Sequence, residues 1–167
     1  MLEVLVDADP EWDSSTDWAA LARAAARAAI AESAFPELGA KSAVELSVRL
    51  AGDEEVRALN AQWRGKDRAT NVLSFPMATP DELARAERAA ELMLGDVILA
   101  HGVCTAEARD KALPLAAHAS HLLVHGTLHL LGYDHHDDRD AEDMERREAR
   151  ALARLGIADP YAVEATH

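Results

Sequence analysis

Cysteine and aromatic residues are scarce in this chain. The single cysteine, Cys104, excludes an internal disulfide framework and suits a reducing compartment. We expect it to be a buried small apolar residue. Aromatic residues make up only 4% of the 167 residues, whereas hydrophobic residues make up 49%. The core must therefore be built mainly from Ala, Leu and Val, which favours helix-rich packing.

Long apolar segments and a basic leader are also missing. No run of about 18 uncharged apolar residues occurs, and the first residues, "MLEVLVDADPEWD", are acidic where a signal peptide would be basic. We therefore expect a soluble, cytoplasmic protein with no membrane partner. The length predicts one domain over residues 1–167.

Positive charge is in short supply, with a formal net charge of −13. This balance argues against a protein that coats nucleic acid by general electrostatics, because that mode needs dense Lys and Arg. It does not argue against a nuclease, since catalysis needs only local positive charge. The acidic stretch "DHHDDRDAEDMERREAR" has helical charge spacing and is expected to be a solvated face.

Hydrophobic periodicity predicts four strands interleaved with helices. The strands are expected at residues 2–6, 43–51, 70–76 and 92–100. Helices concentrate in the second half of the chain. This order predicts an α+β domain with a single small mixed sheet of about four strands packed with helices. The order of the strands in the sheet cannot be read from the sequence.

The helices are predicted from their caps and apolar stripes. The first follows Ser15 or Thr16 as its cap, and the second has Asp53 as N-cap with Val56, Leu59 and Trp63 on its inner stripe. A helix from Thr105 is interrupted at Pro114, before a long apolar helix that carries histidines. The last helix is expected at about 138–155, and residues 77–92 are expected to be flexible or partly helical.

Five histidines fall within the stretch "HLLVHGTLHLLGYDHH". His121, His125 and His129 are four residues apart and line one edge of a helix. The helical rise separates His121 from His129 by roughly 12 Å, too far for both to bind one ion at nitrogen-to-metal distances near ~2.0 Å. Gly132 can end the helix in a left-handed conformation and turn the chain so that His135 reaches the site.

The stretch therefore predicts a site made by His125, His129 and His135 at a helix in the C-terminal half. Three histidines with an open fourth position are typical of catalytic zinc, here one Zn²⁺ ion. His121 either holds a ligand through a hydrogen bond or packs in the core. The four other histidines, His101, His118, His136 and His167, are expected to be solvated.

The position after the first ligand carries no acid. Zinc peptidases of the "HExxH" type have a Glu there as general base, whereas this chain has Gly126. Water activation must then use another group or the metal alone. Asp134 and Asp96 are candidates for that base, although a turn or cap role is the simpler interpretation of each.

These residues are similar to a known family. "HLLVHGTLHLLGYDH" resembles the signature of the YbeY family, the metal-dependent bacterial endoribonucleases of ribosomal RNA maturation. "LNAQWRGKDRATNVLSFP" and "LGDVILA" resemble two further blocks of that family in the same order, so the resemblance spans roughly residues 43–150. It implies that His125, His129 and His135 bind zinc and that Arg64 is required for function.

The charge around Arg64 fits this implication. A guanidinium can hold a phosphodiester and stabilise charge as its bond breaks. Arg64, Lys66 and Arg68 form the densest basic cluster outside the last helix, so Lys66 is a further substrate candidate. The alternative is a set of cations that the dipole favours at a helix C-terminus.

The function predicted from the residues and the resemblance is a zinc-dependent endoribonuclease specific for single-stranded ribosomal RNA. It would act in small-subunit rRNA 3′-end processing and ribosome quality control, on the ribosome small subunit or with assembly proteins, and not on DNA. The net negative charge of the chain favours its recruitment to RNA through a protein partner. Two alternatives stay open: a zinc-dependent peptidase or small-molecule hydrolase, and a non-enzymatic ribosome-assembly factor with structural zinc.

Overall fold

One mixed β-sheet organises the chain. The computed structural model describes residues 1–40, 43–86 and 91–161. Its strands are β1 (Leu2–Ala8), β2 (Ala43–Ala51), β3 (Val72–Pro76) and β4 (Glu91–Ala100), and they lie in the order β1-β2-β4-β3. β1, β2 and β4 are parallel, and β3 is antiparallel to β4. The predicted α+β class with one small mixed sheet is confirmed.

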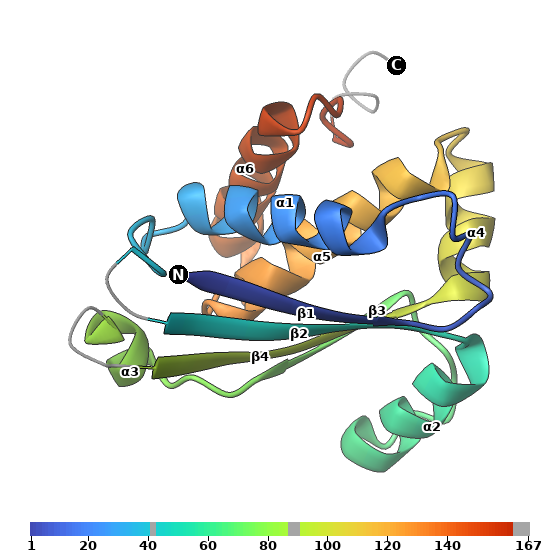
Figure 1. Cartoon of the computed structure of the whole chain (residues 1–167), viewed down its shortest axis with the longest axis horizontal. Coiled ribbons are helices and arrows are strands. Elements are labelled where there is room, and N and C mark those ends of the chain that lie inside the picture. Colours follow the sequence, from blue (N-terminus) through green and yellow to red (C-terminus); the bar gives the residue numbers. More distant parts are fainter. Residues whose placement is uncertain (41–42, 87–90, 162–167) are drawn as a thin grey trace.

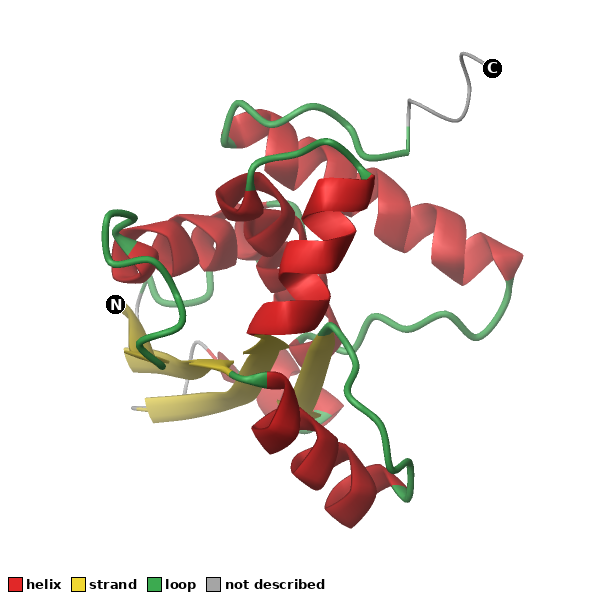
Figure 2. Cartoon of the chain, turned by 90° about the vertical axis from the view of Figure 1, so that its right-hand side faces the viewer, coloured by secondary structure: helices red, strands yellow, loops and turns green. Residues whose placement is uncertain are grey.

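The helices form layers on both sides of the sheet. In the described residues they are α1 (Trp18–Ala31), α2 (Asp53–Arg64), α3 (Pro80–Ala84), α4 (His101–Asp110), α5 (Leu115–Leu130) and α6 (Asp138–Arg154). α1, α5 and α6 lie on one side of the sheet, and α2 lies on the other (Figure 1). The view turned by 90° shows the same separation (Figure 2). No helix within the described ranges is both long and apolar enough to cross a membrane.

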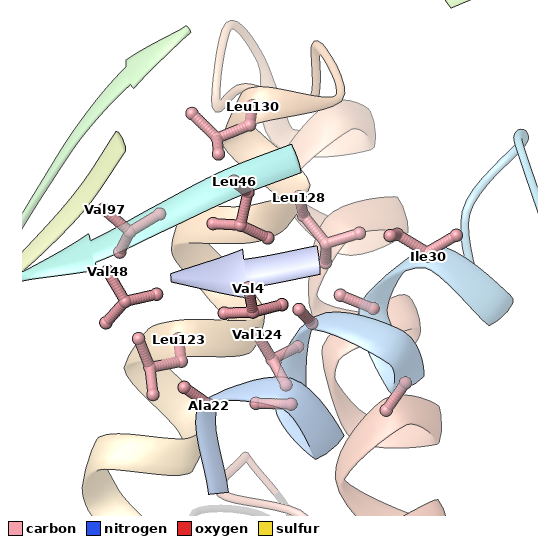
Figure 3. Packing of buried hydrophobic residues seen from close by; sticks show 14 of the residues in the cluster. Val4, Ala22, Ile30, Leu46, Val48, Val97, Leu123, Val124, Leu128 and Leu130 are labelled. Atoms are coloured by element: carbon pink, nitrogen blue, oxygen red, sulfur yellow. The ribbon is translucent and has the colours of Figure 1, made fainter. Parts of the chain in front are cut away.

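The main core lies between the sheet and the helices α1 and α5. Alternation in β2 places Val44, Leu46, Val48 and Leu50 on the inner face, as predicted, and all four are buried. Leu123, Val124 and Leu128 of α5 pack toward this face, beside Ala22 of α1 (Figure 3). The alanines of α1 permit a close approach of helices, which replaces the aromatic bulk that the chain lacks.

A second, smaller core lies under α2. Val56 is fully buried there against Leu73 and Ile98 of the sheet. The expectation that Trp63 continues this inner stripe was wrong, because its side chain is 64% exposed. α2 slants away from the sheet, so only its first turns are covered (Figure 1).

Three helix starts differ from the expectation. Asp17, and not Ser15 or Thr16, caps α1 by accepting the Ala20 N–H at 3.0 Å. α4 begins at His101 and not at Thr105, because the chain enters the helix directly from β4. In the segment 77–92, residues 80–84 form α3, and residues 87–90 lie outside the described part. Cys104 is buried as expected, and burial raises the pKa of its thiol to about 12.

Asp53 caps a different helix from the one expected. It is the first residue of α2, which has no side-chain cap. Its carboxylate accepts the N–H groups of Gly102 at 2.8 Å and Val103 at 3.1 Å, which belong to the first turn of α4. A helix start leaves such N–H groups without intrahelical partners. Asp53 therefore ties the start of α2 to the start of α4.

We expect Asp53→Ala to lower the free energy of unfolding by about 1–2 kcal/mol, the usual effect of losing a cap. Urea denaturation measures it. Asp138→Ala is the matched control: Asp138 also lies in a first helical turn but makes no hydrogen bond or ion pair with the described residues. Equal losses in the two variants would show that only the helix dipole is involved.

Candidate metal centre

The end of α5 shapes the histidine cluster. Gly132 has a φ of +97° and follows the last residues of the helix. Its N–H donates to the His129 carbonyl at 3.0 Å, and the Tyr133 N–H donates to the Leu128 carbonyl at 3.1 Å. This pair of bonds is the Schellman ending of a helix, which needs a left-handed residue. The turn that the sequence predicted at Gly132 is confirmed.

The turn brings His135 back to His125 and His129. One ligand atom from each of the three histidines lies within 4.8 Å of the others. The Nε2 atoms of His125 and His129 are 2.9 Å apart, on adjacent turns of α5. His125 and His129 are half-buried, whereas His135 is exposed. The structure thus assembles the three side chains that the helical spacing selected.

The outer nitrogens of the two helical histidines are already occupied. Nδ1 of His129 lies 2.7 Å from the Tyr133 carbonyl oxygen, and Nδ1 of His125 contacts a carboxylate oxygen of Glu148. Both partners are acceptors, so each Nδ1 is placed to donate a hydrogen bond to its partner. Burial, and then the neighbouring His125, lower the pKa of His129, which favours the neutral form of the His129 ring.

The two Nε2 atoms consequently face each other across 2.9 Å. A proton or a cation can occupy the space between them. A cation between them would satisfy both, and neutral imidazole nitrogens suit Zn²⁺ and several other transition metals. The side chains present therefore fit a metal ion.

Glu148 holds this arrangement from inside α6. Its side chain is fully buried and contacts His125, the Tyr161 hydroxyl and, at 3.6 Å, Nε2 of His121. Burial by itself raises the pKa of this carboxyl, but the nearby His121 and the hydrogen bonds with His125 and Tyr161 outweigh it and hold the pKa at about 2. An ionised carboxylate thus orients the His125 ring.

Sequence reasoning missed both Glu148 and Tyr161. Glu148 lies in the acidic stretch that was interpreted as a solvated face. One signal was available: it stands at helical spacing from Met144 and Leu152, which are both fully buried on the inner face of α6. Tyr161 follows α6 in a segment without periodicity, and no sequence pattern pointed to it.

The remaining histidines separate into distinct roles. His121 does not join the cluster, and its Nε2 lies 3.3 Å from the Tyr161 hydroxyl, beside Glu148. The expectation of a solvated His118 was wrong, because it is 1% exposed and its Nε2 lies 2.8 Å from a Glu107 carboxylate oxygen. His136 is exposed as expected, and His101 is half-buried. His167 lies outside the described residues.

Gly126 explains why no glutamate follows the first ligand. A Cβ at this position would lie 2.7 Å from Cγ1 of Val97 and 3.1 Å from Oγ of Ser74. α5 therefore rests directly on β4 and β3 at this point. A glutamate side chain at position 126 would point into the sheet and could not reach the histidines.

A pocket of 540 Å³ opens in front of the histidines. Its walls come from the loop after α5, from β3 and from the end of α2, and its lining residues are Arg64, Asn71, Val72, Ser74, Pro76, His125, His129, Gly132, Tyr133, Asp134 and His136. Arg64 is thus brought to the pocket from a distant part of the sequence. Lys66 and Asp96 do not line it.

The charged residues around the pocket have few partners. Three cations near the pocket are exposed and form no ion pair with any described residue: Arg64, Lys66 and Arg68. Asp134 is the one carboxylate among the lining residues. It accepts the His135 N–H at 2.7 Å, and this bond lowers the pKa of Asp134. The pocket therefore combines an unpaired guanidinium, one ionised carboxylate and the histidine cluster.

His125 and His129 line the pocket together with Arg64, and His135 lies beside them outside its lining. A cluster of three histidines next to an open pocket that contains an arginine is typical of a metal-dependent hydrolase. Comparison with known proteins narrows this class. The family model "Endoribonuclease YbeY" matches residues 11–156. The chain therefore belongs to the YbeY endoribonuclease family.

Individual relatives agree with this assignment. The chain is 52% identical over 166 residues to an "Endoribonuclease YbeY" of Rhizorhabdus wittichii, covering 98% of both chains. It is 54% identical over 162 residues to one of Novosphingobium aromaticivorans, covering 95% of both. A solution structure of a Thermotoga maritima protein shares the fold, with a TM-score of 0.54 at 22% identity, over 96% of this chain and 99% of that one.

We expect Glu148→Gln to weaken zinc binding about tenfold to a hundredfold, because the charge that orients His125 and favours its Nδ1–H is lost. Competition with a chromophoric chelator measures the affinity. Glu145→Gln on the same helix is the control, because Glu145 forms no hydrogen bond with a histidine among the described residues. Unchanged zinc affinity in Glu148→Gln would remove the orienting role.

We expect Gly126→Ala to destabilise the protein by about 1–3 kcal/mol, because the new methyl group overlaps Val97. Thermal and urea denaturation both report it. Helix propensity alone would stabilise this variant by up to about 1 kcal/mol. The sign of the change therefore separates steric contact from propensity, and a more stable variant would contradict the close packing.

Proposed function

We propose that the chain is a zinc-dependent endoribonuclease that cuts single-stranded regions of ribosomal RNA. His125, His129 and His135 are the proposed metal ligands, and Arg64 is the proposed catalytic contact with the phosphodiester. The observation that carries this proposal is the pocket that Arg64 lines together with His125 and His129, whose Nε2 atoms are 2.9 Å apart. The relatives carry the name "Endoribonuclease YbeY", which supports hydrolysis of RNA as the reaction class.

The roles of the side chains follow from their chemistry. A bound zinc ion supplies Lewis acidity, either toward a phosphoryl oxygen or toward an attacking water. Arg64 holds the non-bridging oxygens of the phosphodiester through its forked N–H groups and offsets charge that develops on them. Asp134 lines the same pocket and is ionised, so it can accept a proton from the attacking hydroxyl or water.

The proposal also includes a biological role. We place the activity in small-subunit rRNA 3′-end processing and ribosome quality control in the cytoplasm. The net charge of −13 leaves little basic surface for RNA outside the cluster of Arg64, Lys66 and Arg68. Recruitment through a ribosomal or assembly protein accounts for this balance. Tight binding of the isolated protein to single-stranded RNA with a steep salt dependence would contradict it.

The alternatives are less well supported. A peptidase of the "HExxH" type lacks its base, and the packing at Gly126 leaves no room for one. A purely structural zinc site would be closed by four protein ligands. In the described residues the histidine cluster instead borders an open pocket, with His135 exposed.

We expect Arg64→Ala to reduce cleavage of single-stranded RNA by on the order of a hundredfold while zinc affinity stays unchanged, because the lost donor acts on the phosphate. His129→Ala should lose both zinc binding and cleavage and keep a cooperative melting curve. Zinc-loaded, RNase-free protein and a defined oligonucleotide serve as the assay.

Arg23→Ala provides the matched control, because Arg23 is an exposed cation on α1 that does not line the pocket. Equal cleavage by wild type, Arg64→Ala and His129→Ala would trace the activity to a contaminant. Mass spectrometry of the products distinguishes the two attacks: a 2′,3′-cyclic phosphate excludes direct attack by water. Unfolding of His129→Ala, or of wild type on metal removal, would favour a structural site.

A further inference from the structure

One wall of the pocket, beside α5, is the free edge of the sheet. β3 is the terminal strand of the order β1-β2-β4-β3 and pairs on one side only, with β4. The residues of β3 that line the pocket are Val72, Ser74 and Pro76, which alternate along the strand. An edge strand carries main-chain groups that no neighbouring strand satisfies.

The hydrogen bonds to β4 show which groups these are. The Ala100 N–H donates to the Asn71 carbonyl at 3.1 Å, and the Met77 N–H donates to the Leu94 carbonyl at 2.9 Å. In an antiparallel pair, every second residue bonds to the neighbouring strand and the residues between point outward. Residues 71, 73, 75 and 77 therefore face β4, whereas Val72, Ser74 and Pro76 turn their main-chain groups toward the pocket.

The outward main-chain groups of β3 include more acceptors than donors. The carbonyls of Val72, Ser74 and Pro76 are all available as acceptors. Of the donors, Pro76 has no N–H, and the Val72 N–H is bound by the side-chain oxygen of Asn71 at 2.7 Å. The Ser74 N–H is consequently the only donor that this edge offers. The Ser74 hydroxyl is directed to the Gly126 carbonyl at 3.4 Å.

This combination of three acceptors and one donor does not suit the addition of a peptide strand to the sheet. A peptide that extends the sheet needs donors and acceptors in alternation along the edge. Here two of the three donors are withheld, as in edges that natural proteins protect against strand addition. A strand of RNA presents a different complement: anionic phosphate oxygens accept hydrogen bonds, whereas 2′-hydroxyls and base N–H groups donate them.

We propose that the free edge of β3 binds the RNA strand, with the Ser74 main-chain N–H donating to a phosphate oxygen and the outward carbonyls of Val72 and Ser74 accepting from nucleotide donors. The inference rests on the proposed function and assigns the substrate a docking wall within the same pocket. Arg64 lines that pocket and supplies the positive charge that a phosphate needs. Ser74 becomes a substrate contact through its backbone.

Hydrogen–deuterium exchange tests the contact on the intact zinc-loaded protein. Between residues 72 and 77, the Ser74 amide is the one that has no partner, so the segment should contain a single fast-exchanging amide. Excess single-stranded RNA is added, and exchange is followed over the first seconds, before the RNA is consumed. We expect at least tenfold slower exchange of that amide. An unchanged rate at saturating RNA would overturn the proposal.

A backbone variant tests the same contact by activity. Ser74→Pro removes an N–H that β4 does not use, together with the side-chain hydroxyl that is directed to the Gly126 carbonyl. Ser74→Ala removes the hydroxyl alone and serves as the matched variant, and proline is tolerated at such edge positions. We expect kcat/KM for RNA to fall on the order of tenfold to a hundredfold, with unchanged zinc affinity. Val6→Pro is the control at the opposite edge strand, β1: the bonds from Val44 N–H to the Met1 carbonyl and from Asp9 N–H to the Leu50 carbonyl imply that Val6 also points its N–H outward.

The outcomes separate this inference from the proposed function. If wild type cleaves RNA while Ser74→Pro cleaves it equally well, the docking wall is wrong and the endoribonuclease stands. If wild type neither binds nor cleaves RNA, the endoribonuclease itself is wrong. A strand-forming peptide that slows the Ser74 amide as strongly as RNA would also overturn the proposal. Should Ser74→Pro fail to fold, the exchange experiment decides alone.

Discussion

The close approach of α5 to the sheet at Gly126 is the constraint on which the site depends. Because no side chain separates the helix from Val97 and Ser74, α5 lies directly on β4 and β3. His125 immediately precedes this contact and His129 follows it by one turn, so both rings are held beside the exposed edge of the sheet. The same contact removes the carboxylate that peptidases place after the first ligand. One steric requirement thus sets both the position of the histidine cluster and the residue types that can lie beside it.

Electrostatic interactions orient the histidine rings that packing has positioned. Glu148 is a buried ion, and the free-energy cost of its burial is offset by hydrogen bonds with His125 and Tyr161 and by the nearby His121. Each Nδ1 of His125 and His129 faces an acceptor, so their Nε2 atoms point at a common space. This arrangement fits a cation. The surrounding acidity of the chain, at −13 overall, then makes the unpaired Arg64 the local exception that an anionic substrate would meet.

Much of this could be predicted from the sequence because it depends on local geometry. Helical rise separated His121 from His129, and a glycine after the helix indicated the turn that returns His135. Alternation in β2 identified the inner face of the sheet. The errors arose where tertiary contacts override local pattern. Trp63 continues an apolar stripe, yet α2 leaves the sheet before reaching it, and Asp53 stands at one helix start but caps another.

The sequence by itself therefore determined the class of fold, the three histidines that come together and the family to which the chain is similar, since periodicity and short-range spacing encode them. Only the tertiary structure decided which residues surround those histidines. Glu148, Arg64 and the edge of β3 reach the site from separate elements, and the burial that makes Glu148 an orienting group exists only when α6 packs on α5. His121 shows the difference most directly: its spacing excluded it as a shared ligand, but its contact with Glu148 and Tyr161 became visible only in the folded chain.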